Sequence, residues 1–192
     1  MSRTLNIKFE PPHKCYSKQK ISSMKVLNTF HPTMVYDGYI IDPSIMDKVS
    51  TKKDKKRNVE FYDYTETNHN LNFIRDVTSG FLEMNGFKHK KDKWYMDVIH
   101  YNLENDVKRV ESGLAWHCEN DNYPDVITVL LYLTIDDSIK EGNIRYKDIH
   151  GVKQVLPLKS GLTVIMDGNV PHKPQDPYGT GKRDLIIMSF EK

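Results

Sequence analysis

The sequence predicts a mainly β protein with supporting helices, folded as a double-stranded β-helix, that is, a jelly roll of the cupin type. Two observations carry this prediction. The first half of the chain holds one amphipathic segment of helical length, and the second half is almost entirely short apolar segments separated by turn residues. One long helix followed by many short strands is typical of a β-barrel supported by helices on one side. The 192 residues show no internal repeat, so a single domain spanning 1–192 is expected.

Composition limits the class of protein. The chain carries 28 basic and 26 acidic side chains and a formal net charge of +2, which by itself indicates neither a nucleic-acid partner nor a membrane partner. No apolar run approaches the roughly 18 residues that span a bilayer, and no signal-peptide segment begins the sequence. Cys15 and Cys118 are the two cysteines, so a structural disulfide is not expected. These features predict a soluble intracellular protein of the cytoplasm.

The N-terminal third is predicted to contribute few regular elements. Residues 1–25 are polar and basic and are expected to form an N-terminal arm, with one edge strand around Leu5–Phe9. Val35–Ile41 is short, aromatic and β-branched, which predicts the first core strand. Asp42 is expected to begin a helical turn. Ser50–Arg57 includes the basic run Lys52–Arg57, expected to be a solvated loop, with contact to an acidic substrate or a phosphate backbone as the alternative.

The best helix lies at His69–Met84. Leu71, Ile74 and Phe81 follow the spacing of one apolar helical face, and Asn85-Gly86 is a C-cap signal. The later segments predict the strands of the jelly-roll core, residues 94–190, with a polar loop at Asn105–Glu111 and an acidic turn at Asp136-Asp137. The expected strands are Lys93–Leu103, Asp125–Thr134, Gly142–Tyr146, a hairpin over Asp148–Leu158 turning at His150-Gly151, Gly161–Met166 and Arg183–Phe190.

A His-x-Glu motif follows one apolar segment. On extended backbone, side chains one residue apart point to the same side, so His117 and Glu119 could reach one ion together while Cys118 points away. His172 follows another predicted strand and supplies a third ligand. Two imidazoles and one carboxylate, with other positions open, are the ligand set of non-haem Fe(II) oxygenases. Asp121 is a minor alternative to Glu119.

An arginine lies eleven positions after His172. A turn at Gly179-Thr180-Gly181 is expected to join two antiparallel strands and to bring Arg183 near the metal, where its planar fork suits a carboxylate. Lys182 could bind the anion instead, but Arg183 shares the parity of the apolar positions of its strand. Asp167 and Asn169 are expected to orient His172 from behind.

In residues 94–190 the sequence resembles the Fe(II)- and 2-oxoglutarate-dependent oxygenase superfamily, and most closely its prolyl-hydroxylase-like branch. The family pattern is His-x-Asp/Glu, a distal His and then Arg or Lys about ten residues later, and it is met by His117, Glu119, His172 and Arg183. Three further segments are similar to family segments and occur in the same order, although Glu119 replaces the commoner Asp and Asn143 replaces a second Gly. These segments are Thr128–Leu133, Glu141–Tyr146 and Met166–His172.

The resemblance implies the cofactors and the roles of the site residues. Fe(II) would be held by His117, Glu119 and His172, and 2-oxoglutarate by Arg183 together with the hydroxyl of Tyr132, with Tyr101 as a looser match to a second family tyrosine. O2 and 2-oxoglutarate would be co-substrates, with ascorbate as a candidate stimulant. The function expected is dioxygenase hydroxylation of a substrate C–H bond.

The resemblance leaves the substrate open. Its prolyl-hydroxylase-like character favours a protein side chain such as proline. A nucleic-acid oxygenase or demethylase is the first alternative, suggested by Trp116 before His117 and by the run Lys52–Arg57. A small-molecule hydroxylase, for example one acting on an amino acid, is the second. A non-catalytic jelly-roll binding module is the least favoured. The sequence indicates no oligomeric state.

Overall fold

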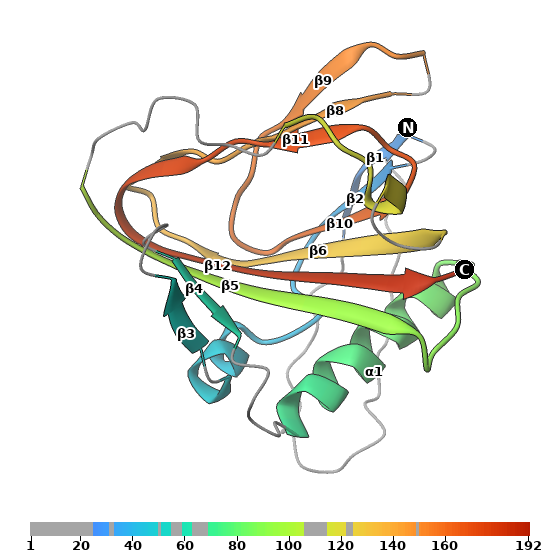
Figure 1. Cartoon of the computed structure of the whole chain (residues 1–192), viewed down its shortest axis with the longest axis horizontal. Coiled ribbons are helices and arrows are strands. Elements are labelled where there is room, and N and C mark those ends of the chain that lie inside the picture. The colour runs from blue at the N-terminus through green and yellow to red at the C-terminus, as the bar shows by residue number, and fades with distance from the viewer. Residues whose placement is uncertain are drawn as a thin grey trace.

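The fold is built from two antiparallel sheets and one long helix. The computed structural model describes residues 25–30, 33–49, 51–54, 59–62, 69–105, 115–121, 125–148 and 150–192. Figure 1 shows the small sheet on one side of the large sheet and the helix α1 on the other. The chain is therefore layered as small sheet, large sheet and helix, and the predicted jelly roll with helical support is confirmed.

The strands account for most of the described elements. They are β1 (Lys25–Phe30), β2 (Thr33–Asp37), β3 (Thr51–Asp54), β4 (Val59–Tyr62), β5 (Trp94–Asn105), β6 (Val126–Ile135), β7 (Ile139–Glu141), β8 (Ile144–Lys147), β9 (Lys153–Leu156), β10 (Leu162–Asp167), β11 (His172–Pro174) and β12 (Pro177–Glu191). The helical elements are η1 (Pro43–Lys48), α1 (His69–Met84) and η2 (Glu119–Asp121).

The two sheets differ in size. Within the described ranges the large sheet has the order β1-β2-β10-β6-β12-β5-β4-β3, with β7 paired to β12, and the small sheet has the order β11-β8-β9. Neighbouring strands in both sheets pair antiparallel, which lets them be joined by short turns. The turn at Gly151 (φ +74°) joins β8 to β9, so the hairpin turns where it was predicted to. Its first strand, β8, lies before Asp148, where the predicted hairpin began.

The helix α1 has the bounds that the apolar periodicity predicts. Ile74, Phe81 and Leu82 are buried against the large sheet, and they form the outer core, the layer between sheet and helix. After the helix the amide of Phe87 donates to the carbonyl of Leu82, and Gly86 takes a left-handed φ of +82°, as the predicted C-cap requires. Among the described segments, no helix has both the length and the apolar character that a membrane crossing needs.

The large sheet buries both of its faces. Along β6, Val129 and Leu131 face the outer core, whereas Leu130 and Tyr132 face the inner core, the layer between the two sheets. Such double burial explains why the sequence of β6 is continuously apolar and does not alternate with polar residues. The inner core positions the candidate site, because the residues of the small sheet face it from the opposite side.

The N-terminal region departs from the sequence prediction in two places. Thr51–Asp54 forms β3, paired with β4, although Ser50–Arg57 was expected to be a loop. The pairing with a neighbouring strand at the edge of the large sheet outweighs the low strand propensity of this charged segment. The strand β1 was not predicted, and the expected edge strand around Leu5–Phe9 lies outside the described residues. Pro43–Lys48 forms the expected helical turn, capped by the side chain of Asp42.

The predicted turn at Gly179-Thr180-Gly181 is wrong, because β12 runs without reversal through all three residues. A Cβ atom on Gly179 would lie 2.2 Å from the carbonyl oxygen of Ser138, and one on Gly181 would lie 2.6 Å from the carboxylate of Asp136. The glycines therefore allow β12 to pass close to the acidic turn after β6, and they do not reverse the chain. Consequently β11 and β12 lie in different sheets and are not two arms of one hairpin.

Candidate metal centre

His117, Glu119 and His172 come together at the edge of the inner core. One ligand atom from each lies within 4.8 Å of the others. The Oε1 atom of Glu119 is 3.4 Å from Nε2 of His172 and 3.9 Å from Nε2 of His117. Two imidazole nitrogens and one carboxylate oxygen thus converge on a common point, as the sequence spacing predicted.

The backbone brings the two histidines side by side. His117 and His172 form a β-bridge in which each amide donates to the other's carbonyl, at 3.1 Å and 2.9 Å. Side chains opposite each other in an antiparallel pair point to the same side, and the two ring centroids lie 4.3 Å apart. Strand β11 in turn pairs with β8, so His172 is fixed by the small sheet.

Glu119 reaches the histidines from a different local structure than predicted. It begins the 3₁₀ turn η2 and does not continue an extended strand from His117. The turn is closed by Asp121, whose backbone amide donates to the carbonyl of Cys118 and whose carboxylate accepts from the amide of Cys118 at 2.9 Å. Polar residues that bond their own backbone favour such turns over strands. The carboxylate of Glu119 still lies beside the histidines, as predicted, but a turn places it there and not an extended strand.

Each imidazole is oriented by a backbone carbonyl. Nδ1 of His117 donates to the carbonyl of Ala115 at 2.9 Å, and Nδ1 of His172 donates to that of Val170 at 3.0 Å. A proton held on Nδ1 leaves Nε2 of the neutral ring as the lone-pair donor, which is the state a metal needs. The predicted orienting role of Asp167 and Asn169 is thus taken by the Val170 carbonyl in direct contact with the ring.

The electrostatics of the cluster favour an ionised Glu119. When no metal is bound, a proton on Nε2 of His172 can donate to Glu119 and lowers the pKa of Glu119 below its ordinary value, and positive charge on His172 or His117 acts in the same direction. Partial burial opposes this effect and is outweighed. The cluster therefore holds an anionic oxygen beside two imidazoles, which is the donor chemistry of a divalent transition metal.

Arg183 lies in the inner core, on the face of β12 that also carries Leu185. It is 3% exposed, whereas Lys182 is exposed on the opposite side of the strand. The guanidinium group of Arg183 donates from Nη2 to the backbone carbonyl of Gly142 at 3.2 Å. Its Nε has no hydrogen-bond partner in the described part of the chain. A buried cation with an unused N–H donor is rare in folded proteins and indicates a place for an anion.

Tyr101 and Tyr132 flank this guanidinium group. Its carbon atom lies 5.2 Å from the ring centroid of Tyr101 and 5.6 Å from that of Tyr132. The strand register explains the contact, because Tyr101 is the partner of Arg183 across β5 and β12 and Tyr132 pairs with Leu185. Burial raises the pKa of Tyr132 to about 12, although the nearby Arg183 opposes the shift. Tyr132 is therefore a protonated phenol beside a cation at neutral pH.

The backbone before β8 completes the surroundings of Arg183. Glu141 and Gly142 both take left-handed conformations, with φ of +56° and +76°. A Cβ atom on Gly142 would lie 2.8 Å from Nη1 of Arg183, so a glycine is needed for the backbone to come this close. The sequence matches this segment to a family motif but indicates no contact for it.

Asp121, the predicted alternative to Glu119, lies outside the ligand group, and so does Cys118, which was predicted to point away from it. The carboxylate of Asp121 is engaged by the amide of Cys118, and Sγ of Cys118 contacts the carbonyl of Asn169 at 3.5 Å. Neither belongs to the described group of donors that could hold a metal. The sequence indicated no role for Asn120, which the structure places between the turn of Glu119 and the loop before His172. A single asparagine beside a ligand gives no sequence signal of such a contact.

The fold is shared with known oxygenases. No protein-family model matches the sequence, and no curated protein is significantly similar to it. A 2OG-Fe(II) oxygenase family oxidoreductase from Burkholderia pseudomallei matches with a TM-score of 0.61 and 10% identity over 83% of this chain and 84% of that one. A prolyl-4-hydroxylase from Pseudomonas putida matches with a TM-score of 0.52 and 11% identity over 83% and 92%.

A third similar structure carries bound ligands. HygX from Streptomyces hygroscopicus, with nickel, 2-oxoglutarate and hygromycin B bound, matches with a TM-score of 0.56 and 11% identity over 83% of this chain and 82% of that one. These likenesses define the class by its fold: the chain is a jelly roll of the kind that 2OG-Fe(II) oxygenases have. Within that class, the neighbours include a prolyl-4-hydroxylase, so the resemblance expected from the sequence is confirmed at the level of the fold.

Proposed function

We propose that this protein is an Fe(II)- and 2-oxoglutarate-dependent dioxygenase that hydroxylates a substrate C–H bond. One observation carries the proposal. In a jelly roll of the oxygenase kind, the cluster of His117, Glu119 and His172 occurs together with a buried Arg183 that has an unused N–H donor. The cluster fits a metal and the arginine fits a carboxylate, and this enzyme class needs both.

The donor set fits iron. Two neutral imidazoles and one carboxylate on one side of an ion leave open positions for other ligands, and this combination is the facial triad of non-haem Fe(II) oxygenases. His172 is 4% exposed, while the side chains of His117 and Glu119 are 23% and 18% exposed. The donor side chains are thus partly exposed to solvent while the backbone of the two histidines is held by their β-bridge, as a site that admits co-substrates requires.

The surroundings of Arg183 fit the distal carboxylate of 2-oxoglutarate. Burial of an unpaired guanidinium group is unfavourable, and a carboxylate that accepts from it would remove the penalty. Tyr132 would add its hydroxyl as a second donor, and Tyr101 would line the same place. The carbonyl of Gly142, which accepts from Nη2, keeps the guanidinium fork in one orientation before the anion arrives.

The residues then have distinct roles. Bound iron, together with 2-oxoglutarate and O2, supplies the oxidation: O2 and 2-oxoglutarate react with R–H to give R–OH, succinate and CO2. His117, Glu119 and His172 would hold the ion, and the backbone carbonyls that accept from Nδ1 orient the two rings so that Nε2 is the atom directed at it. Arg183 and Tyr132 bind and orient the co-substrate, and the apolar inner core excludes water from it.

For the substrate, we propose a protein side chain such as proline. The fold likeness to a prolyl-4-hydroxylase supports this choice. A small molecule, for example an amino acid, is the competing choice, since HygX has the same fold and binds hygromycin B. Succinate release that depends on a proline-containing peptide, with mass gain of one oxygen on the peptide, would support the first. Release stimulated by free amino acids and by no peptide would overturn it.

The first experiment tests cofactor binding without the substrate. Under anaerobic conditions, addition of Fe(II) and 2-oxoglutarate to the protein should produce the weak visible charge-transfer band of the chelate. His172→Ala should abolish the band, and Arg183→Ala should require far more 2-oxoglutarate to reach it. Lys182→Ala is the matched control, because this neighbouring cation is exposed and should leave the titration unchanged.

The outcomes separate enzyme from binding module. A band with these dependences, followed by succinate formation in air, supports the dioxygenase. No band in the wild type, and no succinate in air, would overturn the proposal and favour a non-catalytic jelly-roll module. Equal sensitivity to Lys182→Ala and Arg183→Ala would contradict the placement of 2-oxoglutarate at Arg183.

A second candidate substrate is a nucleic acid, favoured by one face of the small sheet. Arg145 and Lys147 alternate with buried residues of β8, and they pair in register with Lys173 and Lys153 of the adjacent strands. None of these four cations has a carboxylate partner among the described residues. Lys147 also lies 5.5 Å from the ring of Trp116, next to His117. Unpaired cations beside an aromatic residue suit a single strand.

Salt dependence tests this candidate. The affinity for a single-stranded oligonucleotide should fall with salt, and the double variant Arg145→Gln/Lys153→Gln should lower the log–log slope by roughly 0.7 for each phosphate that is no longer neutralised. The control is Lys90→Gln/Lys91→Gln, since these lysines pair with Glu191 and Glu83. Absence of salt-sensitive binding would remove the nucleic-acid candidate and leave the protein side chain and the small molecule as candidate substrates.

A further inference from the structure

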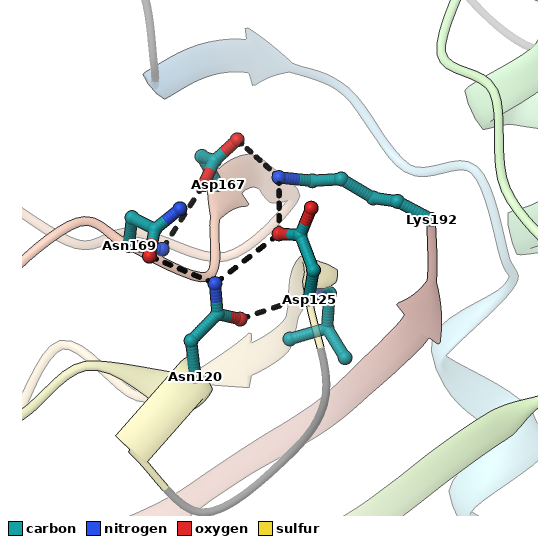
Figure 2. A network of polar contacts seen from close by, with 6 residues as sticks. Asn120, Asp125, Asp167, Asn169 and Lys192 are labelled. Atoms are coloured by element: carbon teal, nitrogen blue, oxygen red, sulfur yellow. Dashed lines mark hydrogen bonds and ion pairs between the residues drawn. The ribbon is translucent and has the colours of Figure 1, made fainter.

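Asn120 joins the two segments that carry the metal ligands. Its backbone amide donates to the carbonyl of Gly168 at 3.1 Å, and its side-chain Nδ2 donates to Oδ1 of Asn169 at 2.8 Å. Asn120 follows Glu119 directly, while Gly168 and Asn169 belong to the loop that leads to His172. Figure 2 shows the Asn120 side chain between this loop and the start of β6. The residue therefore bridges the ligand segments at a point away from the ligands themselves.

The side chain of Asn120 has no spare hydrogen-bonding group. Its Oδ1 accepts from the amide of Val126 at 3.0 Å, and Nδ2 donates to Asp125 at 3.2 Å as well as to Asn169. Both amide hydrogens are therefore used, and the carbonyl oxygen is fixed by a strand of the large sheet. An amide with both ends engaged has one orientation, which makes it a rigid spacer between segments.

The opposite segment is shaped to accept this spacer. A Cβ atom on Gly168 would lie 2.1 Å from Oδ1 of Asn120, so only glycine permits the approach. One acceptor of Asn120, the carboxylate of Asp125, is held in turn by Lys192, whose Nζ lies 2.8 Å from Asp125 and 2.6 Å from Asp167. Asp167 itself accepts from the backbone amide of Asn169. Figure 2 shows these ion pairs on the far side of the network from Asn120. The loop before His172 is thus tied both to the large sheet and to Asn120.

We propose that Asn120 is a positioning residue that sets the spacing between the Glu119 carboxylate and His172. The inference rests on the proposed function, because this spacing matters only if Glu119 and His172 bind one metal ion. Glu119 sits on the one-turn element η2. Besides Asn120, the described side-chain ties between this segment and the loop of His172 are the 3.4 Å contact of Glu119 with His172 and the weaker contact of Cys118 Sγ with the carbonyl of Asn169 at 3.5 Å. Without the side chain of Asn120, the turn η2 could shift relative to the loop. Part of the free energy of metal binding would then be needed to bring the three donor atoms together, and the affinity for the metal would fall.

The experiment measures the affinity of the apoprotein for Co(II), an ion that reports its ligand geometry through its visible absorption. Asn120→Ala and Asn169→Ala each remove the bridging hydrogen bond from one side. Each should weaken Co(II) binding by about 10- to 100-fold and change the shape of the absorption band. The double variant should be no worse than Asn120→Ala alone, because the two changes remove one shared hydrogen bond.

Lys192→Ala is the control for a purely structural role. It removes the outer ion pairs but leaves the four hydrogen bonds of Asn120 in place. We expect Lys192→Ala to keep the wild-type affinity and band shape, with any effect confined to the thermal midpoint. Asn169→Ala keeps the test decisive if Asn120→Ala does not fold, because the side chain of Asn169 is exposed.

The results separate failure of this inference from failure of the proposed function. If the wild type binds no Co(II), the metal site itself is contradicted. If the wild type binds and both asparagine variants bind within about twofold of it, with unchanged spectra, the inference fails while the metal site stands. Loss of affinity in Lys192→Ala equal to that in Asn120→Ala would show general loosening of the network and would also overturn the inference.

Discussion

The two faces of the large sheet bury layers of different character. The outer core, under α1, is formed mostly by apolar side chains, and its hydroxyl groups at Thr78 and Tyr36 donate to the carbonyl of Ile74 and to the side chain of Asn85. The inner core, under the small sheet, includes Tyr132 and contacts the buried guanidinium group of Arg183. The outer core has the composition of a layer that only stabilises the fold, whereas the inner core holds a guanidinium charge that has no carboxylate partner among the described residues and opposes folding.

This difference indicates that the face of the large sheet under α1 stabilises the fold, whereas the face under the small sheet carries the candidate site. A sheet backed by a well-packed helix can keep its shape while the opposite face carries groups that would destabilise a smaller protein. The strands β6 and β12 belong to both layers, so each presents apolar residues to α1 and site residues to the small sheet. Rigid strands also place functional side chains more accurately than loops do.

Neighbouring residues of β12 offer the sharpest test of this division. Ile186 faces α1 and Leu185 faces the inner core, opposite Tyr132. Ile186→Ala and Leu185→Ala should each lower the free energy of unfolding by about 2–5 kcal/mol, because both side chains are buried. Denaturant unfolding measures this effect.

Cofactor affinity then distinguishes the two variants. Ile186→Ala should leave the affinity of the folded protein for 2-oxoglutarate unchanged, and Leu185→Ala should weaken it, because the side chain of Leu185 lies in the core layer of the residues proposed to bind the co-substrate. Titration at a temperature well below both unfolding midpoints keeps stability from affecting the comparison. Equal affinities in the two variants would mean that the two faces are not functionally distinct.

The buried charge provides the second test. Arg183→Met removes an incompletely paired cation and retains most of its apolar volume, so the unfolding free energy of the apoprotein should rise by about 1–4 kcal/mol. Affinity for 2-oxoglutarate should fall by at least about 100-fold in the same variant, since the guanidinium group proposed to bind its carboxylate is gone. A variant that is both less stable and unable to bind would show that Arg183 supports the fold, contrary to the expected difference between the two cores.

Stability without ligand is the informative quantity for this variant. With saturating 2-oxoglutarate, the wild type gains stability by mass action and the order of the two proteins should reverse. Arg183→Lys is a useful companion because it keeps the charge but loses the planar fork. It should lose affinity for 2-oxoglutarate without the gain in apoprotein stability.

Much of this layout could be predicted from the sequence, for identifiable reasons. The helix His69–Met84 has a single apolar face with the period of a helix, so its bounds follow from the pattern. The segment around Val129 is a short apolar run rich in β-branched residues, which favours a strand over a helix. His117, Glu119 and His172 could be predicted because their spacing is a known pattern, and their assembly requires only that the two apolar segments lie near each other.

What could not be predicted depends on contacts between distant residues. The glycines at 179 and 181 indicate a turn when considered locally, and only the acidic turn near Asp136 reveals that they permit a close approach. Glu119 was expected on extended backbone because the competing hydrogen bond from the amide of Cys118 to the carboxylate of Asp121 cannot be seen in a sequence pattern. The role of Asn120 likewise depends on Asn169, which lies far away in the chain.

A smaller effect is expected from the backbone that holds Arg183. Gly142→Ala places a methyl group 2.8 Å from Nη1 of Arg183 on a residue with φ of +76°. The conformational penalty should lower stability by about 1–2 kcal/mol, and displacement of the guanidinium group should also reduce 2-oxoglutarate affinity. Isothermal titration measures the affinity.

Gly151→Ala is the matched control for this change. Gly151 has a similar φ of +74°, but a methyl group there would meet no atom within 4 Å. It should show the stability penalty and no change in affinity. If both variants bind 2-oxoglutarate like the wild type, the contact between Gly142 and Arg183 does not matter for the co-substrate.

The smallest expected effect compares two buried tyrosines, one in each core. Burial raises the pKa of Tyr36, in the outer core, and of Tyr132, in the inner core, to about 12 in both cases, but only Tyr132 lies beside a cation that lowers it. Because both pKa values are raised on folding, these phenols stabilise the protein fully below pH 10, and that contribution is lost as the pH rises through about 12. Arg183→Met should therefore raise the pKa of Tyr132 further and leave that of Tyr36 unchanged. Ultraviolet titration of tyrosinate, with Tyr132→Phe and Tyr36→Phe to assign the two late steps, measures both values, and an equal shift of the two would contradict the separation of the charge from the outer core.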